Sequence, residues 1–429
     1  MPGMNGGPAP AGSALATAFK AALLGQGELA LLVFAVLAIT WVACRELLPA
    51  GARSRLSAQR LARPAEPTGR AIIRIGFGIL WIFDAILQGQ PGMPAGLPSH
   101  VLAPAADGSP GWVRDLVSWA GTGWSQHPVQ DGVAAVWIQL GIGVWLLAAA
   151  RGRPSRAAGL GCAGWGLVVW VFGEAFGGML GSGQSLLTGA PGAALLYAAG
   201  GLLVALPARY WWSPRLGRLW LRVLGVGLAA AALLQAWPGR GYWQGTAAGG
   251  RPGPLAAMAA SMSATPQPGF LARLVAGFGS LASAHGFAVN LVSVIALAAG
   301  AAALLAGPAR VVRPAVLMLT VFFLADWVLV QDLGLFGGLG TDPNSMLPLS
   351  LLVAGALAAA TRVRAADAAE PADLEPDLLS RRGAHQRRLL PRQLRVAAGT
   401  ASASVVVAVW AAAIMLLGAA PMALAQAPR

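Results

Sequence analysis

The sequence predicts an all-α fold: a polytopic transmembrane helical bundle of about 10 helices, arranged as two parallel four-helix repeats plus flanking helices. Three observations predict this class: the composition, the length of the apolar runs, and an internal repetition. Of the 429 residues, 56% are hydrophobic and only 11% are charged, which excludes an ordinary water-soluble globule. Membrane-spanning strands are also excluded, because the apolar runs are continuous rather than alternating.

The apolar runs set the expected membrane spans, since a helix needs about 20 apolar residues to cross the hydrocarbon core. In order along the chain, the predicted spans are roughly 29–49, 71–90, 132–150, 157–179, 190–206, 218–237, 285–306, 312–332, 346–361 and 402–424. The last run resembles a signal peptide with an Ala-x-Ala site, but its place near the end of the chain favours a transmembrane anchor.

The positions of the basic residues predict the topology. The formal net charge is +14, which by itself would suggest a nucleic-acid partner. If the segments between alternate spans face the cytoplasm, those segments and their adjoining helix ends hold 24 of the 30 Lys and Arg residues. This asymmetry follows the positive-inside rule and places both termini outside, so no nucleic-acid partner is indicated. The single lysine, Lys20, among many arginines, with abundant Ala and Gly, indicates a GC-rich bacterial genome and therefore the bacterial inner membrane.

Two parts of the chain repeat each other. Residues 74–92 match 222–239, with an Arg at the start and Gln-x-x-Pro-Gly at the end, and residues 111–127 match 269–285. The stretch WVFGEAFGGMLGSG, which begins at Trp170, matches WVLVQDLGLFGGLG. Four helices in each copy give both copies the same orientation, as in parallel transporter repeats.

This repetition predicts the domain organisation. The predicted parts are an N-terminal segment with a flanking helix at 1–50, a first repeat at 71–206, a second repeat at 218–361, a basic cytoplasmic loop at 362–400 and a C-terminal helix at 401–429. The basic loop is expected to be drawn to anionic lipid head groups. Within each repeat an amphipathic segment is expected to lie in the outer interface, either as a lid that seals the bundle or as a substrate gate.

Polar side chains inside or at the outer ends of the spans are the candidate ligand-binding or proton-binding residues: Asp84, Gln88, Glu174, Asp326, Gln331 and Asp332. An Asp at a helix centre costs about 2.5–3.5 kcal/mol on insertion scales unless it finds partners. Because the helices of Asp84, Glu174 and Asp326 run outward, we expect all three in the outer half of the membrane, lining one shared cavity. The alternative is that each forms a separate interhelical hydrogen bond that only packs helices.

Histidine and cysteine are sparse. His127 and His285 occupy matching places at the outer start of a helix, so a pair of them could bind a metal or ligate a haem. The alternative is that they are solvated interfacial residues that cap their helices. Cys44 and Cys162 lie in different spans, which excludes a CxxC redox pair and a disulfide framework.

The start Arg74-x-Gly76-x-Gly78, the long outer loop and the three further helices resemble the DoxX-like family of four-helix bacterial membrane proteins. The resemblance covers 71–206 and, more weakly, 218–361. Some members of that family are subunits of a thiosulfate–quinone oxidoreductase, and others accompany redox or detoxification enzymes. The resemblance therefore implies a subunit or accessory protein of a quinone-associated membrane redox system, with a membrane or periplasmic oxidoreductase as its partner.

The sequence contains no complete catalytic motif, so a non-catalytic membrane subunit is expected rather than an enzyme. Besides the DoxX-like redox role, two other functions fit the same residues. One is a small-solute or proton-coupled transporter with an outward-facing acidic cavity. The other is a structural or assembly factor whose polar residues only pack helices.

Overall fold

The computed structural model describes residues 10–47, 66–181, 183–246, 250–334 and 339–361. These residues form helices joined by turns and contain no strand, which confirms the all-α prediction for this part of the chain. Seven of the helices are long and apolar enough to cross a membrane. The protein is therefore a multi-pass membrane protein whose helices contact lipid.

The seven long helices are α1 (Pro10–Leu47), α3 (Thr68–Gln88), α7 (Pro128–Ala148), α8 (Gly152–Val168, continued to Gly173 by the π-helix η2), α11 (Pro214–Ala236), α14 (Gly286–Ala306) and α15 (Ala309–Leu329). Two further apolar helices, α9 (Ala193–Ala205) and α16 (Met346–Thr361), have only 13 and 16 residues. At 1.5 Å per residue they extend about 20 and 24 Å, less than the ~30 Å of hydrocarbon. The predicted segments 362–400 and 402–424 lie outside the described residues.

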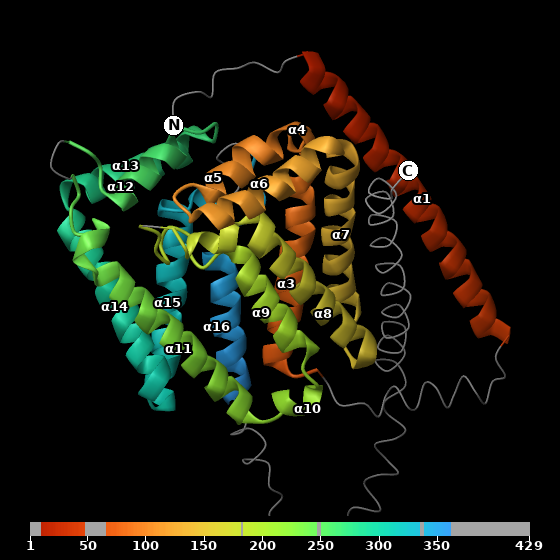
Figure 1. Ribbon diagram of the computed structural model, residues 1–429. Coiled ribbons are helices and arrows are strands. Elements are labelled where there is room, and N and C mark those ends of the chain that lie inside the picture. The colour runs from red at the N-terminus through yellow and green to blue at the C-terminus, as the bar shows by residue number, and fades with distance from the viewer. Residues whose placement is uncertain (1–9, 48–65, 182, 247–249, 335–338, 362–429) are drawn as a thin grey trace, which may run out of the picture.

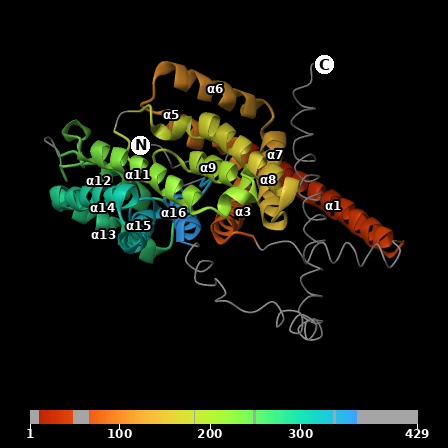
Figure 2. The ribbon, with the colours of Figure 1, turned by 90° about the horizontal axis from the view of Figure 1, so that it is seen from below.

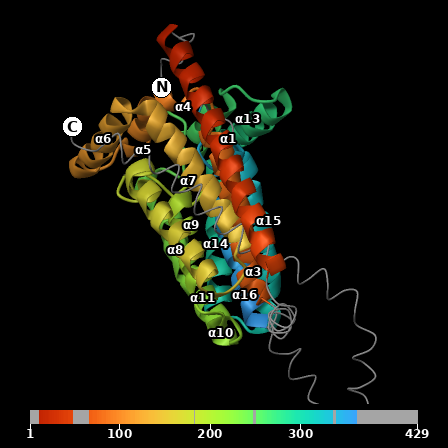
Figure 3. The ribbon, with the colours of Figure 1, turned by 90° about the vertical axis from the view of Figure 1, so that its right-hand side faces the viewer.

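The first helix begins earlier than the predicted span 29–49. α1 starts at Pro10, and its apolar stretch is Ala14–Thr40. Its first turns are rich in Ala and Leu, which are the strongest helix formers, so the helix extends toward the N-terminus. α1 packs against α7 through Phe19, which is buried with Val133 and Val136. Figure 3 shows α1 crossing in front of α7.

Short helices cover one end of the bundle, which we call the cap end (Figure 1). They are α4 (Met93–Gly96), η1 (Leu97–Leu102), α5 (Ala103–Ala106) and α6 (Gly111–Gln126) between α3 and α7, and α12 (Pro254–Ser263) and α13 (Gly269–Ala284) between α11 and α14. α6 buries Val113 and Val117, while Trp112 and Trp119 are exposed on its other side. The amphipathic segments are thus helices with one packed face.

The opposite end carries the turn α10 (Ala208–Trp211), so we call it the α10 end (Figure 1). Two buried arginines of α3 lie there. The guanidinium of Arg70 donates to Glu66 at 2.7 Å, and that of Arg74 donates to Glu66 at 2.8 Å. Their remaining N–H groups donate mainly to backbone carbonyls at the ends of α7 and α9. The arginines therefore tie three helix ends together and satisfy carbonyls that have no partner inside their own helices.

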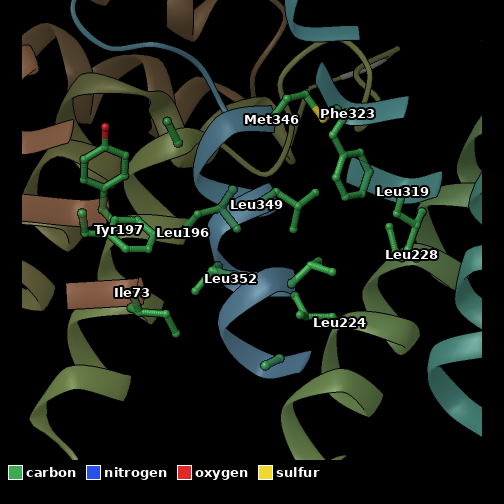
Figure 4. Packing of buried hydrophobic residues seen from close by; sticks show 14 of the residues in the cluster. Ile73, Leu196, Tyr197, Leu224, Leu228, Leu319, Phe323, Met346, Leu349 and Leu352 are labelled. Carbon is green, nitrogen blue, oxygen red and sulfur yellow. The ribbon is translucent and has the colours of Figure 1, made fainter. Parts of the chain in front are cut away.

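α16 is the central helix. Seen from below (Figure 2), it lies between α3 and α9 on one side and α15 on the other. In Figure 4, Leu352 of α16 lies between Ile73 and Phe323, which come from these two sides. α16 packs against α3 and α9 on one side and against α11 and α15 on the other, so it joins these helices in one core.

Candidate functional site

A cavity lies at the cap end between α3, α7, the end of α8 and the start of α9. It is lined by Trp81, Asp84, Gln88, Gln139, Val169, Glu174, Ala193, Ala194, Tyr197, Thr341 and Asp342. The last two residues come from the loop before α16, far along the chain from the others. The cavity has room for roughly two or three water molecules.

Asp84 and Gln88 are one turn apart on α3, so both side chains lie on the same face of the helix. Gln139 of α7 reaches the same cavity from the neighbouring helix. These three side chains are at most 8% exposed. One oxygen of each, Oδ1 of the Asp and Oε1 of each Gln, accepts no hydrogen bond. The cavity therefore gathers buried oxygens that lack a hydrogen bond, together with the NH2 groups of the two glutamines and the Tyr197 hydroxyl.

Glu174 follows directly after the π-helix η2 (Val169–Gly173), and its N–H donates to the Val169 carbonyl at 2.9 Å, the i to i−5 bond of a π-helix. Its carboxylate oxygens accept hydrogen bonds from the Ala194 N–H at 3.0 and 3.2 Å. The side chain thus caps the N-terminus of α9, where the helix dipole favours negative charge. Gly192 allows this approach, because a Cβ there would collide with the carboxylate.

The loop 339–345 brings the third carboxyl group, Asp342, into the lining. Its carboxylate accepts hydrogen bonds from the Thr341 hydroxyl at 3.0 Å and from the Asn344 N–H at 2.8 Å. The loop is held against α3, because Gln90 donates to the Gly340 carbonyl at 3.0 Å. Burial raises the pKa of Asp342 above its ordinary value, and the two hydrogen bonds oppose this. Asp342 is close enough to interact electrostatically with the other two carboxyl groups of the cavity.

Trp81 and Tyr197 form the aromatic wall of the cavity, with ring centroids 4.8 Å apart at an interplanar angle of 79°. The indole N–H of Trp81 donates to the Cys162 sulfur at 3.1 Å, and that thiol donates to the Tyr197 carbonyl at 3.3 Å. The Tyr197 hydroxyl lies beside the Asp84 carboxyl and interacts with it. Figure 4 shows this hydroxyl directed away from the apolar cluster. Hydrogen bonds therefore hold the wall in place, and its hydroxyl lies next to the Asp84 carboxyl.

No basic side chain lines the cavity. Arg74 and Arg70 lie on the same helix as Asp84, but they are 10 and 14 residues away, which is about 15 and 21 Å along the axis. Their charges are already matched by Glu66 and by helix C-terminal carbonyls. The three carboxyl groups consequently have no cationic partner among the described residues around them.

The other predicted site residues lie elsewhere. Asp326 is 5% exposed on the packed face of α15, and neither of its carboxylate oxygens has a hydrogen bond. Gln331 donates to the Leu187 carbonyl and to Ser345, both at 3.4 Å. Asp332 begins the turn η5 (Asp332–Gly334), and burial raises its pKa to about 6. Of the six predicted residues, the structure therefore places Asp84, Gln88 and Glu174 around one cavity and the other three outside its lining.

His127 precedes α7 and His285 precedes α14, each at the N-cap position. Over the described ranges, no group of three or more His, Cys, Asp or Glu side chains is arranged to hold a metal ion. Asp131, one turn into the same helix, interacts electrostatically with His127. Neither histidine lines the cavity, and neither side chain makes a capping hydrogen bond to its helix.

Most of the lining was not predicted, and three of the missed residues, Gln139, Tyr197 and Asp342, carry polar groups that the argument uses. Gln139 carries a signal that would have found it, since an amide in the middle of an apolar span is a functional candidate by the same argument as Asp84. Tyr197 carries a weaker signal as one of three tyrosines in the chain. Asp342 has none, because its place depends on how a loop folds over a distant part of the chain.

Two turns at the cap end share one backbone path. After α8, Ala175 and Phe176 have φ of +49° and +61°, and after α15, Asp332 and Leu333 have the same two values. In the 3-10 turn η3 (Ala175–Gly178) and in η5, a glycine follows, also with positive φ. The Trp170 indole donates to the Pro191 carbonyl at 2.9 Å, and the Trp327 indole donates to the Pro343 carbonyl at 2.7 Å. The turns thus match in conformation and in the bond that closes them.

Comparisons of the chain with protein-family models, with curated protein sequences and with solved structures find no match. The chemistry of the cavity is therefore the strongest guide to function.

Proposed function

We propose that this protein is a proton-coupled transporter of a small solute in the bacterial inner membrane, and that the cavity is its outward-facing binding site. One observation carries the proposal: three carboxyl groups from distant parts of the chain line one cavity, with no basic residue beside them. Buried carboxyl groups that interact electrostatically oppose one another's ionisation, so binding a solute and binding protons become coupled. Acids inside a membrane protein commonly mark such proton and substrate pathways.

The charge asymmetry of the sequence supports the proposed orientation. With the arginine-rich segments in the cytoplasm, the cap end faces outside and both termini are extracytoplasmic. The proposed total of about ten spans adds α9, α16 and the segment 402–424 to the seven long helices. α9 and α16 are short because irregular turns precede them at the cap end. Such turns are stable at membrane depth where protein or a wet cavity surrounds them.

The matching turns support a tandem duplication of a four-helix unit, with α3, α7, α8 and α9 in one copy and α11, α14, α15 and α16 in the other. α6 and α13 each have 16 residues, and α7 and α14 each have 21. The matching φ values align Glu174 with Gln331, in the register set by the two tryptophans.

Matched helix by helix, the second copy lacks the polar residues of the cavity. Asp84 corresponds to Ala231 or Ala232, Gln139 to Leu297, and, when Pro191 is aligned with Pro343, Tyr197 to Leu349; all of these second-copy residues are buried in the apolar core. The first copy therefore carries the cavity, and the second copy contributes Asp342 through its last loop. Two chemically different copies, rather than two equal ones, are what a single binding site requires.

Proteoliposomes test this proposal. Vesicles that contain the full chain and a pH-sensitive dye are exposed to a panel of small cationic, neutral and anionic solutes. We expect a solute-driven pH change that Asp84→Asn abolishes and that Asp326→Asn, a buried acid outside the cavity, retains. Equal responses of wild type and Asp84→Asn would overturn the proposal. If Asp84→Asn changes only the stability of the protein, a structural or assembly role is favoured.

A quinone-associated redox role is the second candidate, and the DoxX-like resemblance and the aromatic wall of Trp81 and Tyr197 favour it. Hydroxyl and protonated carboxyl groups can hydrogen-bond a quinone carbonyl. Against it, the cavity has room for only two or three waters, so a quinone ring would enter only after the loop 339–345 had moved. Quinone in the purified protein, or an oxidoreductase that co-purifies with it, would support this role.

A further inference from the structure

We infer that the cavity selects a small cation that carries N–H groups, namely ammonium or a short primary ammonium ion. The inference rests on the proposed function and names the chemical class of its solute. It follows from four features of the cavity: the unpaired acceptors, the missing positive charge, the spacing of the oxygens and the aromatic wall.

The unpaired groups in the cavity require a donor. Oδ1 of Asp84 and Oε1 of both Gln88 and Gln139 are buried and accept no hydrogen bond. A buried acceptor without a partner costs about 1–3 kcal/mol, and more if it is charged. Because an amide can turn either its oxygen or its NH2 group toward the cavity, both glutamines can accept from an occupant that donates hydrogen bonds.

The charge of the lining requires a cation. Asp84, Glu174 and Asp342 approach one another, and no Lys, Arg or His lies in the lining. An anionic solute would add to their repulsion. A monovalent cation offsets this repulsion. When the cation leaves, protons can bind to the carboxyl groups instead, and the proposed transport cycle needs this exchange.

The spacing of the oxygens favours N–H donors over a bare metal ion. Hard metal ions draw several oxygens together to about 2.0–2.6 Å. Among the described residues no three acidic or histidine side chains converge in that way. An ammonium nitrogen holds acceptors at about 2.7–3.2 Å in divergent directions, which suits oxygens that come from α3, α7 and a loop.

The aromatic wall and the volume of the cavity narrow the class of cation further. Trp81 and Tyr197 present aromatic rings to the cavity, and a cation within about 6 Å of such a ring is attracted to its face. The Trp81 N–H is engaged by Cys162, so this ring offers its π-surface rather than a donor. Room for two or three waters accommodates ammonium or methylammonium and excludes bulky amines.

The test compares two cations of equal charge and similar size that differ in N–H groups. Isothermal titration calorimetry on the full chain in detergent, at constant ionic strength, measures binding of ammonium chloride and of potassium chloride. We expect ammonium to bind at least about tenfold more tightly, because only ammonium donates hydrogen bonds. Equal affinity for the two cations, or no binding of ammonium, would overturn the inference.

Variants tie the binding to this cavity. Gln139→Leu removes one unpaired acceptor without changing the charge, and Asp342→Asn removes a charge on a loop outside the long helices. Each should weaken ammonium binding about tenfold, whereas Asp326→Asn should leave it unchanged. The two variants lie on different elements. If one of them fails to fold, the other still shows whether ammonium binds in this cavity. Wild-type affinity in the folded variants would contradict the assignment.

The outcomes separate this inference from the proposed function. If vesicles show a solute-driven pH change that depends on Asp84, but ammonium neither drives it nor binds, the transporter stands and the cation class is wrong. If ammonium binds in the cavity but no solute drives a pH change, the cavity is a cation site and the transport role is wrong. If ammonium does not bind and no solute drives a pH change, both are overturned.

Discussion

At the scale of single residues, the position of the Glu174 carboxylate depends on a close contact with a glycine, Gly192. Glu174 both lines the cavity and caps α9, so its carboxylate has one fixed position. Gly192 makes room for it, with φ of +93° and with no space for a Cβ. A residue with a side chain at this position would meet both a disfavoured backbone conformation and a collision.

We therefore predict that Gly192→Ala lowers the free energy of unfolding by about 1–3 kcal/mol and displaces the Glu174 carboxylate from the cavity. The matched control is Gly164→Ala on α8, where a Cβ meets nothing within 4 Å. Thermal unfolding of the purified variants in detergent measures the difference. Equal melting temperatures for the two variants would contradict this account of Gly192.

The raised pKa of Asp332 leads us to expect that the stability of the protein depends on pH. Burial raises its pKa from 3.8 to about 6, so the folded state binds this proton more tightly than the unfolded state does. The contribution of Asp332 to stability is therefore full below about pH 4 and is lost as the pH rises through 6. Asn tolerates positive φ well, so Asp332→Asn should fold.

The measurement is the melting temperature of wild type and Asp332→Asn at several values between pH 4 and pH 7. We expect the stability of the variant to fall less across this window, since it lacks the titrating group. Asp107→Asn in an exposed turn controls for the loss of a carboxyl group. Parallel pH profiles for wild type and Asp332→Asn would show that Asp332 is not responsible.

At the scale of elements, the start of α3 joins three helix ends through two buried arginines. Arg70 and Arg74 are 3% and 5% exposed, and Glu66 supplies the acidic partner for both. The backbone carbonyls of Leu146, Ala150 and Val204 accept further hydrogen bonds from them. The network closes the α10 end below the cavity, so a polar route through the first copy would have to pass it.

Replacing Glu66, the acidic residue of this network, should lower the free energy of unfolding. Glu66→Gln leaves two buried guanidinium groups without a counter-charge, and we expect a loss of about 3–5 kcal/mol in the free energy of unfolding. Asp115→Asn on the exposed face of α6 is the matched control and should change it by less than about 0.5 kcal/mol. Denaturant unfolding of both variants in detergent checks this, and similar midpoints would show that the network contributes little.

At the scale of the whole molecule, the two proposed copies meet at α16, and the cavity draws on both. Asp84 lies where the second copy has Ala231 or Ala232, both among apolar side chains. A buried carboxyl group with an unpaired oxygen is a cost to the fold that a packing role would not require.

The proposed function therefore predicts that Asp84→Ala melts at the same temperature as wild type or higher, while it loses the solute-driven pH change in vesicles. The variant gives the first copy the residue that the second copy already has. Thermal unfolding and the vesicle assay, made on the same preparations, decide the matter. A strong destabilisation would instead show that Asp84 holds helices together.

The sequence alone determined the class of the protein, because composition and the length of apolar runs are local properties that the bilayer constrains directly. It also predicted that Asp84 and Gln88 share a face, since a spacing of four residues fixes this in any helix. The length of α9 and the first residue of α1 were harder to predict from the sequence. Helix ends depend on capping and packing, which here include the contact of Glu174 with Ala194.

Only the tertiary structure decided which polar groups meet. Asp326 resembles Asp84 in sequence context, since both lie in apolar helices. Its helix, α15, does not border the cavity, and its side chain lies outside the lining. Asp342 reaches the cavity because a loop packs on α3 more than 200 residues away in the chain. Helical periodicity relates residues within one element, whereas contacts between elements depend on the packing of the whole bundle, and a site built from several helices is of this second kind.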